Sequence, residues 1–160
     1  MGGGKLGKIL VVEISIDWAW LFIFFLVVYT LAVGYFPTFY PDFTVATNWV
    51  IGVLAALLLF ASVLVHELSH SVMARRYGMT IRGITLFLFG GVSQMTDEPR
   101  SAKQEFWIAI VGPIASFVLA LTFYALGGLG AATGWPGPAV AVLGYLALIN
   151  LLLGIFNLVP

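Results

Sequence analysis

The stretch VLVHELSHSV, residues 63–72, lies inside a long apolar run and carries both histidines of the chain. His66 and His70 are four residues apart, so on an α-helix their side chains lie on one face, a turn apart. Two imidazoles at this spacing can occupy two corners of a tetrahedral zinc site, and Glu67 can serve as a base beside it. The stretch therefore predicts a helix that carries metal chemistry in a hydrophobic environment.

The composition is that of a membrane protein. Of the 160 residues, 61% are hydrophobic and 9% are charged, whereas soluble domains are about 45–50% apolar and about 25% charged. Seven basic and seven acidic residues give a formal net charge of zero, which provides no electrostatic case for binding nucleic acid. Because the chain has no cysteine, disulfides, thiolate metal sites and c-type haem attachment are excluded.

Four hydrophobic runs are long enough to cross a bilayer, which takes about 20 helical residues. They cover residues 18–36, 48–74, 104–126 and 139 to the end. The Gly/Pro-rich segment GGLGAATGWPGP is expected to form a loop between the last two runs. We therefore predict an α-helical integral membrane protein with about four transmembrane helices.

Segments outside these runs have the composition of β-strands. Residues 80–89 and 92–95 are rich in β-formers and flank a predicted turn at Gly90 and Gly91, and residues 8–17 alternate like a strand. Unpaired strands cannot lie open in lipid, because exposed backbone polar groups are costly there. We therefore expect a small β-sheet at the membrane interface or against the helices.

The basic residues are confined to two segments. All seven precede the first run or lie between the second and third runs: Lys5, Lys8, Arg75, Arg76, Arg82, Arg100 and Lys103. Residues 37–48 and 127–139 contain none. By the positive-inside rule, the N-terminus and the 75–103 segment face the cytoplasm. This orientation also places the small β-sheet at the cytoplasmic side.

The pattern HExxH alone is short enough to arise by chance, and on a soluble helix it often reflects solvation. In a transmembrane helix the functional interpretation of the motif is favoured over chance. An ionisable side chain at the centre of such a helix costs about 3 kcal/mol on insertion scales and is functional by default. The flanking LLLFASVLV offers no solvated face. We therefore expect His66 and His70 to be metal ligands and Glu67 to be the general base.

Further segments surround the motif in a recognisable order. HELSHSVMARRYGMTIRGITLFLFGGVSQM is followed by EPRSAKQEFWIAIVGPIASFVLA and then by NLLLGIFNLVP, and KILVVEISIDWAWLF precedes them. Together they resemble the site-2 proteases, intramembrane zinc metalloproteases, and most closely the subgroup that carries C-terminal CBS domains. The resemblance implies that residues 1–160 form a single site-2-protease-like membrane core domain.

The resemblance also implies a zinc ligand that this sequence lacks. In the family the third ligand is an aspartate a few residues beyond an Asn-x-x-Pro element, and this sequence stops at Pro160. Catalytic zinc normally has three protein ligands, so two imidazoles alone form a weak site. We expect the domain to be incomplete at its C-terminus, and the 160-residue chain to bind zinc poorly and cleave little.

Three residues are secondary site candidates. By resemblance, Asn157 matches the family asparagine that contacts the substrate backbone or stabilises the oxyanion, and an interhelical hydrogen bond is the alternative. Gly90 and Gly91 either form a plain hairpin turn or adjoin a strand edge that holds an extended substrate by β-augmentation.

Two features of the later helices are expected to serve packing. Asn150 is expected to make an interhelical hydrogen bond. Gly112-Pro113 is expected to be a packing feature of the third helix, with a kink as the alternative.

The predicted function is that of a zinc-dependent intramembrane metalloendopeptidase. With Zn²⁺ as cofactor, it would hydrolyse a peptide bond in or near a transmembrane segment of a membrane-tethered regulatory protein. Its expected partners are this membrane-embedded substrate and the lipid bilayer. Two alternatives stay open: a catalytically inactive membrane scaffold that binds client helices, and a small metal transporter. A transport path should carry polar groups on several helices, and the first and third runs have almost none.

Overall fold

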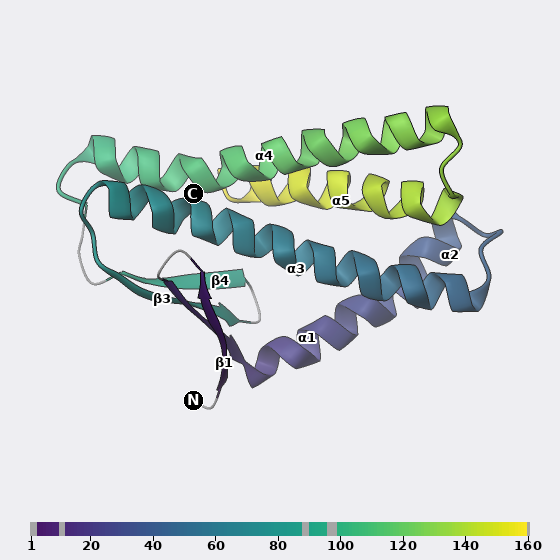
Figure 1. The fold of residues 1–160 in the computed structure, drawn as a ribbon, viewed down its shortest axis with the longest axis horizontal. Coiled ribbons are helices and arrows are strands. Elements are labelled where there is room, and N and C mark those ends of the chain that lie inside the picture. The colour runs from purple at the N-terminus through teal and green to yellow at the C-terminus, as the bar shows by residue number, and fades with distance from the viewer. Residues whose placement is uncertain (1–2, 10–11, 88–89, 96–98, 160) are drawn as a thin grey trace.

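The computed structural model describes residues 3–9, 12–87, 90–95 and 99–159 of the chain. The described chain is mostly helical (Figure 1). Its elements in chain order are β1 (Gly3–Ile9), β2 (Val12–Asp17), α1 (Trp18–Tyr29), the π-helical segment η1 (Thr30–Tyr35), α2 (Phe36–Phe39), α3 (Val45–Arg76), β3 (Ile81–Phe87), β4 (Gly90–Met95), α4 (Ala102–Thr133) and α5 (Gly137–Phe156).

The prediction of four membrane-spanning helices is confirmed by length and composition. The described residues contain 4 helical spans of sufficient hydropathy: Trp18–Phe39, Val45–Arg76, Ala102–Thr133 and Gly137–Phe156. The first span joins α1, η1 and α2 without a break. The last span ends at Phe156, so the expectation that it continues to the end of the chain is wrong, and Asn157 lies at its C-terminal cap.

The loop predicted between the last two spans is much shorter than expected. Most of GGLGAATGWPGP belongs to α4, which ends at Thr133, and Gly134 terminates it in the left-handed conformation with φ of 77°. Glycine is common in transmembrane helices, where it allows close packing. Here the Trp135 ring packs on Gly130, and a Cβ at that glycine would lie 3.0 Å from Trp135 Cε3.

The helices expose large apolar side chains and bury small or polar ones. Phe22, Phe25 and Tyr124 are each more than 60% exposed, as are several other large apolar residues along the spans. Such continuous apolar exposure is unfavourable in water and natural against lipid. The buried polar side chains of the described residues are Asn48, Ser62, His66, Ser71, Ser116 and Asn150.

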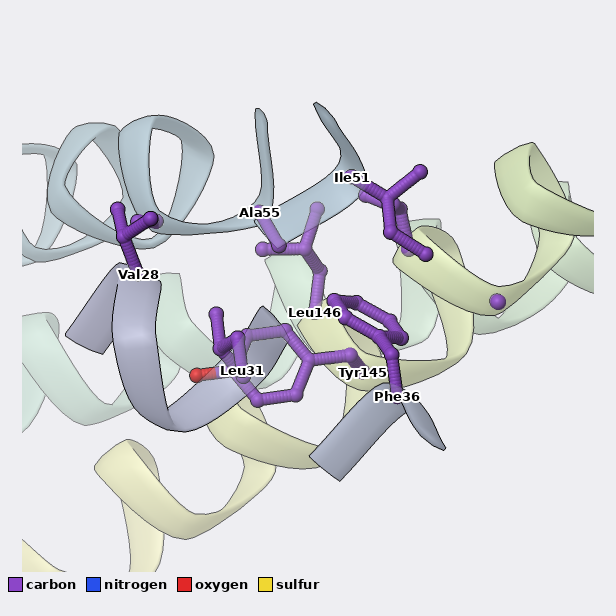
Figure 2. Packing of buried hydrophobic residues seen from close by; sticks show 10 residues of the cluster. Val28, Leu31, Phe36, Ile51, Ala55, Tyr145 and Leu146 are labelled. Carbon is purple, nitrogen blue, oxygen red and sulfur yellow. The ribbon is translucent and has the colours of Figure 1, made fainter. Parts of the chain in front are cut away.

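The main apolar core joins the first span, α3 and α5 (Figure 2). Its labelled members in the figure are Val28, Leu31, Phe36, Ile51, Ala55, Tyr145 and Leu146. Small residues bring the helices close together at this core: a Cβ at Gly52 of α3 would lie 3.2 Å from Ala32 Cβ. The spans therefore pack through close backbone approach, as is usual for helices in lipid.

The four strands form one sheet in the order β1-β2-β3-β4. β1 and β2 are antiparallel, β2 and β3 are parallel, and β3 and β4 are antiparallel. The sheet lies at the end of the helix bundle where α3 ends and α4 begins, near the N-terminus (Figure 1). Its position on the cytoplasmic side stays a prediction.

Two expectations about the strands are wrong in detail. The segment 8–17 is not one strand, because it contributes to both β1 and β2. Gly90 and Gly91 are not a turn: they open β4, where they pair with Phe87 and Leu86. Residues 88–89 of the predicted 80–89 strand lie outside the described residues.

The end of α3 is fixed by a Schellman cap. Gly78 has φ of 80°, and its N–H donates to Arg75 O at 2.9 Å while Met79 N–H donates to Ala74 O at 3.1 Å. This 5→2 and 6→1 pattern satisfies carbonyls that the helix leaves unpaired. Ala74 and Met79 are buried together with Ile108 of α4. The cap therefore sets where the end of α3 meets α4.

We expect Gly78→Ala to lower the free energy of unfolding by about 1 kcal/mol, because a Cβ is unfavourable in the left-handed conformation. Reversible unfolding in mixed micelles, followed by circular dichroism, measures this change. Gly128→Ala is the matched control, since this helical glycine has open space around it and alanine favours helix. Equal stability of the two variants would contradict the role of the cap.

Candidate metal centre

His66 and His70 of α3 bring their Nε2 atoms together. The two atoms are 3.1 Å apart, and the rings are inclined by 72° with centroids 4.8 Å apart. His66 is only 1% exposed, and His70 is partly buried. The predicted alignment of the two imidazoles on one helix face is therefore present in the structure.

The Nδ1 atom of each ring is held by α4. His70 Nδ1 lies 2.6 Å from Ile108 O, and His66 Nδ1 lies 2.8 Å from Ser116 Oγ. A carbonyl oxygen only accepts hydrogen bonds, so His70 Nδ1 carries the proton and donates it. In the neutral ring, His70 Nε2 is then an acceptor with a free lone pair. The Nδ1 contacts thus turn both Nε2 atoms toward the same point.

One row of residues on α4 forms the wall opposite the histidines. Ile108, Gly112 and Ser116 follow at intervals of four, so they lie along one face of the helix. Gly112 is the member nearest to both rings: a Cβ there would lie 2.7 Å from His66 Nε2 and closer still to His70 Nε2. The absence of a side chain at Gly112 therefore lets both Nε2 atoms approach the backbone of α4 closely.

The arrangement of the two rings fits a zinc ion. Tetrahedral coordination with Zn–N distances of 2.0–2.1 Å separates two nitrogen ligands by about 3.3 Å, close to the 3.1 Å between these Nε2 atoms. Ligating histidines usually donate their other ring N–H to an oxygen acceptor, which fixes tautomer and orientation. Both rings have an oxygen in that place. The donor set and its geometry thus suit zinc.

The remaining predicted centre is less complete. Glu67 follows His66 on α3 and is half-buried. Within the described residues, no group of three His, Cys, Asp or Glu side chains is placed to hold a metal ion. The aspartate ligand that the resemblance implies beyond Pro160 therefore stays a prediction.

The secondary candidates lie apart from the histidine contacts. Asn157 is exposed, and its Nδ2 donates to Leu153 O of its own helix at 2.8 Å. Gly90 and Gly91 lie in the sheet, at the start of β4. The structure thus brings together His66 and His70 and records no hydrogen bond between them and these three residues.

Asn150 makes the interhelical contact that its position predicts. Its Nδ2 donates to Ser62 Oγ of α3 at 3.2 Å and to Leu146 O at 2.9 Å. Ser62 lies one turn before His66 on α3. The polar pair therefore joins α5 to the same stretch of α3 that carries the histidines.

Sequence reasoning missed most of the part that α4 plays. The expectation that Gly112 is a packing feature is confirmed, but its partners are the two imidazoles. Ser116 carried a weak signal, since it follows Gly112 by the interval that separates the histidines. The carbonyl of Ile108 carried none, because every residue has one.

Comparison with known proteins identifies the relatives of this chain. The family model described as "Peptidase family M50" matches residues 54–136. A Synechocystis sp. protein named "Putative zinc metalloprotease sll0528" is 39% identical over 156 residues, which cover 98% of this chain and 40% of that protein. "Zinc metalloprotease MJ0392" of Methanocaldococcus jannaschii is 35% identical over 73% of this chain and 33% of its own length.

A solved structure shares the fold. The site-2 protease from Methanocaldococcus jannaschii superposes with a TM-score of 0.63 at 29% identity, covering 99% of this chain and 65% of that one. By comparison, the chain spans about 40% of the length of the Synechocystis relative. The M50 match covers more than half of the 160 residues. This chain therefore belongs to peptidase family M50, as its resemblance to the site-2 proteases predicted.

Proposed function

We propose that this chain is the core of a zinc-dependent intramembrane endopeptidase. Its substrate would be a membrane-tethered regulatory protein, cut at a peptide bond in or near a transmembrane segment. The observation that supports this proposal most is the convergence of His66 Nε2 and His70 Nε2 at 3.1 Å, inside a bundle of helices that are long and apolar enough to span a membrane.

In this proposal the two Nε2 atoms bind the metal, and an aspartate beyond Pro160 completes the site. A zinc ion held by His66 and His70 would supply Lewis-acid chemistry at the scissile carbonyl and would lower the pKa of a water molecule toward neutral. The buried position of His66 limits the water around the reacting groups, which strengthens the electrostatic interactions there. The contacts from α4 hold both rings in place before substrate arrives.

Glu67 would move the proton. Adjacent to a ligand on α3, it would accept a proton from the attacking water and later deliver it to the leaving amine nitrogen. Glu67 lies toward the C-terminal end of α3, a few residues before Arg75, and in the proposed orientation water would reach it from that side. General acid–base catalysis of this kind contributes about 10²–10⁴-fold to the rate.

The secondary residues would handle the substrate. β4 is at the edge of the described sheet, so Gly90 and Gly91 could hold an extended substrate segment by β-augmentation. Asn157, exposed at the end of α5, would bind the substrate backbone or stabilise the oxyanion once its amide leaves Leu153 O. A peptide bond within a helix is shielded, so an extended substrate is what a protease of this kind requires.

The proposed orientation places the sheet and the N-terminus in the cytoplasm. The sheet, the end of α3 and the start of α4 lie at one end of the bundle, whereas the α4–α5 connection lies at the other (Figure 1). This arrangement matches the segregation of the basic residues to one end.

We expect Glu67→Gln to lower cleavage of a model transmembrane peptide by about 10²–10⁴-fold while zinc binding persists, because the variant loses the base and keeps both imidazoles. The assay uses proteoliposomes and a form of the protein that carries the predicted aspartate. Glu105→Gln, at the start of α4, is the control and should cleave normally. Undiminished cleavage by Glu67→Gln would refute the mechanism. If the unsubstituted protein bound zinc but did not cleave the peptide, the alternative function of a catalytically inactive membrane scaffold would be favoured.

We expect Gly112→Ala to weaken zinc binding by at least about tenfold, the effect typical of losing ligand orientation. The added Cβ would overlap both Nε2 atoms and force the two rings to move. Zinc titration of the detergent-solubilised chain measures the change. Gly128→Ala on the same helix has open space around it and should bind like the parent. Equal zinc binding by Gly112→Ala would contradict the proposed position of the metal.

Cysteine labelling tests the orientation in a chain that has no native cysteine. We expect Ala132→Cys to react with a membrane-impermeant maleimide on intact cells, and Ala102→Cys to react only after permeabilisation. Both positions are exposed and lie at opposite ends of α4. The reverse pattern would show that the orientation is wrong.

A further inference from the structure

Ser116 differs from other hydroxyl residues of the helices in where its hydroxyl bonds. Ser62, Ser69, Thr122 and Thr133 each donate to the carbonyl four residues earlier in their own helix, which is the usual arrangement within helices. The hydroxyl of Ser116 instead lies 2.8 Å from His66 Nδ1 of the neighbouring helix. Ser116 is fully buried, so this bond forms away from water.

The two histidines are anchored by chemically different groups. The carbonyl of Ile108 admits one tautomer of His70, because it can only accept a proton. A serine hydroxyl can donate or accept, so the contact with Ser116 is compatible with either tautomer of His66. Which nitrogen of His66 is available to a ligand therefore depends on the direction of the Ser116 hydrogen bond, together with the hydrogen bond that His66 makes to the backbone of Gly112.

Each direction of the hydrogen bond between Ser116 and His66 goes with a different tautomer of His66. When Ser116 O–H donates to Nδ1, the neutral His66 ring carries its proton on Nε2, which can donate to His70 Nε2 at 3.1 Å. When Ser116 Oγ accepts from Nδ1–H, both Nε2 lone pairs point at the same place. The hydroxyl hydrogen can then turn to the carbonyl one turn earlier, as in other helix serines.

We propose that Ser116 is a positioning residue that sets the tautomer and orientation of His66 for metal binding. This inference rests on the proposed function, in which His66 and His70 bind zinc. Ser116 touches neither the metal nor the substrate; it acts through His66. Without its hydroxyl, His66 keeps its place on α3 but loses the acceptor that favours the ligating tautomer. Outer partners of this kind typically change metal affinity by about 10–100-fold.

The test is a zinc chloride titration of the 160-residue chain in detergent micelles, followed by ¹⁵N NMR of labelled histidine and carried to zinc concentrations high enough to fill the weak site that two imidazoles form. The chain contains 2 histidines, so the spectrum is simple, and a His70→Gln variant assigns it. Nitrogen shifts distinguish N–H, lone-pair and metal-bound positions. In the parent, both rings should carry their proton on Nδ1 before zinc is added, and zinc should shift both Nε2 signals to the metal-bound position.

We expect Ser116→Ala to raise the zinc midpoint by about tenfold and to populate both His66 tautomers without metal, while the His70 Nδ1 signal, set by Ile108 O, stays unchanged. Ser116→Thr, which keeps a hydroxyl, should restore the parent midpoint. Thr122→Val, which removes a hydroxyl bonded within α4, should have no effect. An unchanged His70 Nδ1 signal also shows that the variant is folded, because the contact of His70 Nδ1 with Ile108 O depends on the packing of α3 against α4.

Two results would overturn the inference in distinguishable ways. If Ser116→Ala bound zinc with the parent midpoint and kept the parent tautomer of His66, Ser116 would have no positioning role while the metal proposal stood. If zinc left both histidine signals of the parent unchanged, the metal proposal would fail and the inference with it.

Discussion

The contact between α3 and α4 around the two histidines is the interaction on which the candidate centre depends. His66 and His70 are one turn apart on α3, and Ile108, Gly112 and Ser116 follow at the same interval on α4. Matching rows give the Nδ1 atom of each ring an oxygen partner on α4. In a hydrocarbon environment such matching is required, because unpaired polar groups cost several kcal/mol. The same pairing turns two ring nitrogens toward one another.

The rest of the bundle holds that contact in register. At the sheet end, the Schellman cap at Gly78 fixes Ala74 and Met79 against Ile108, the residue whose carbonyl anchors His70. One turn before His66, Ser62 bonds to Asn150 of α5. Farther along α3, small residues bring the first span close. Stability and site geometry thus rest on the same few close approaches, so substitutions there are expected to affect both.

The parts that would handle a substrate are arranged differently from the metal pair. His66 and His70 lie on one continuous helix and are held on their inner sides. Gly90 and Gly91 lie in a separate sheet, and Asn157 lies past the last helical turn. In the proposed function, the metal-binding residues and the substrate-binding residues therefore lie on different parts of the fold.

The sequence by itself determined the four spans, the pairing of His66 with His70, and the family, because hydropathy and helical spacing act within a single segment. The sequence-based predictions were wrong where contacts with neighbouring elements determine the local structure. These cases are the helical state of residues 127–133, the strand position of Gly90 and Gly91, and the end of the last span at Phe156. Only the tertiary structure placed Ile108, Gly112 and Ser116 against the histidines. The crossing angle and axial offset of two helices depend on side-chain packing between them, and no repeat within one helix encodes that offset.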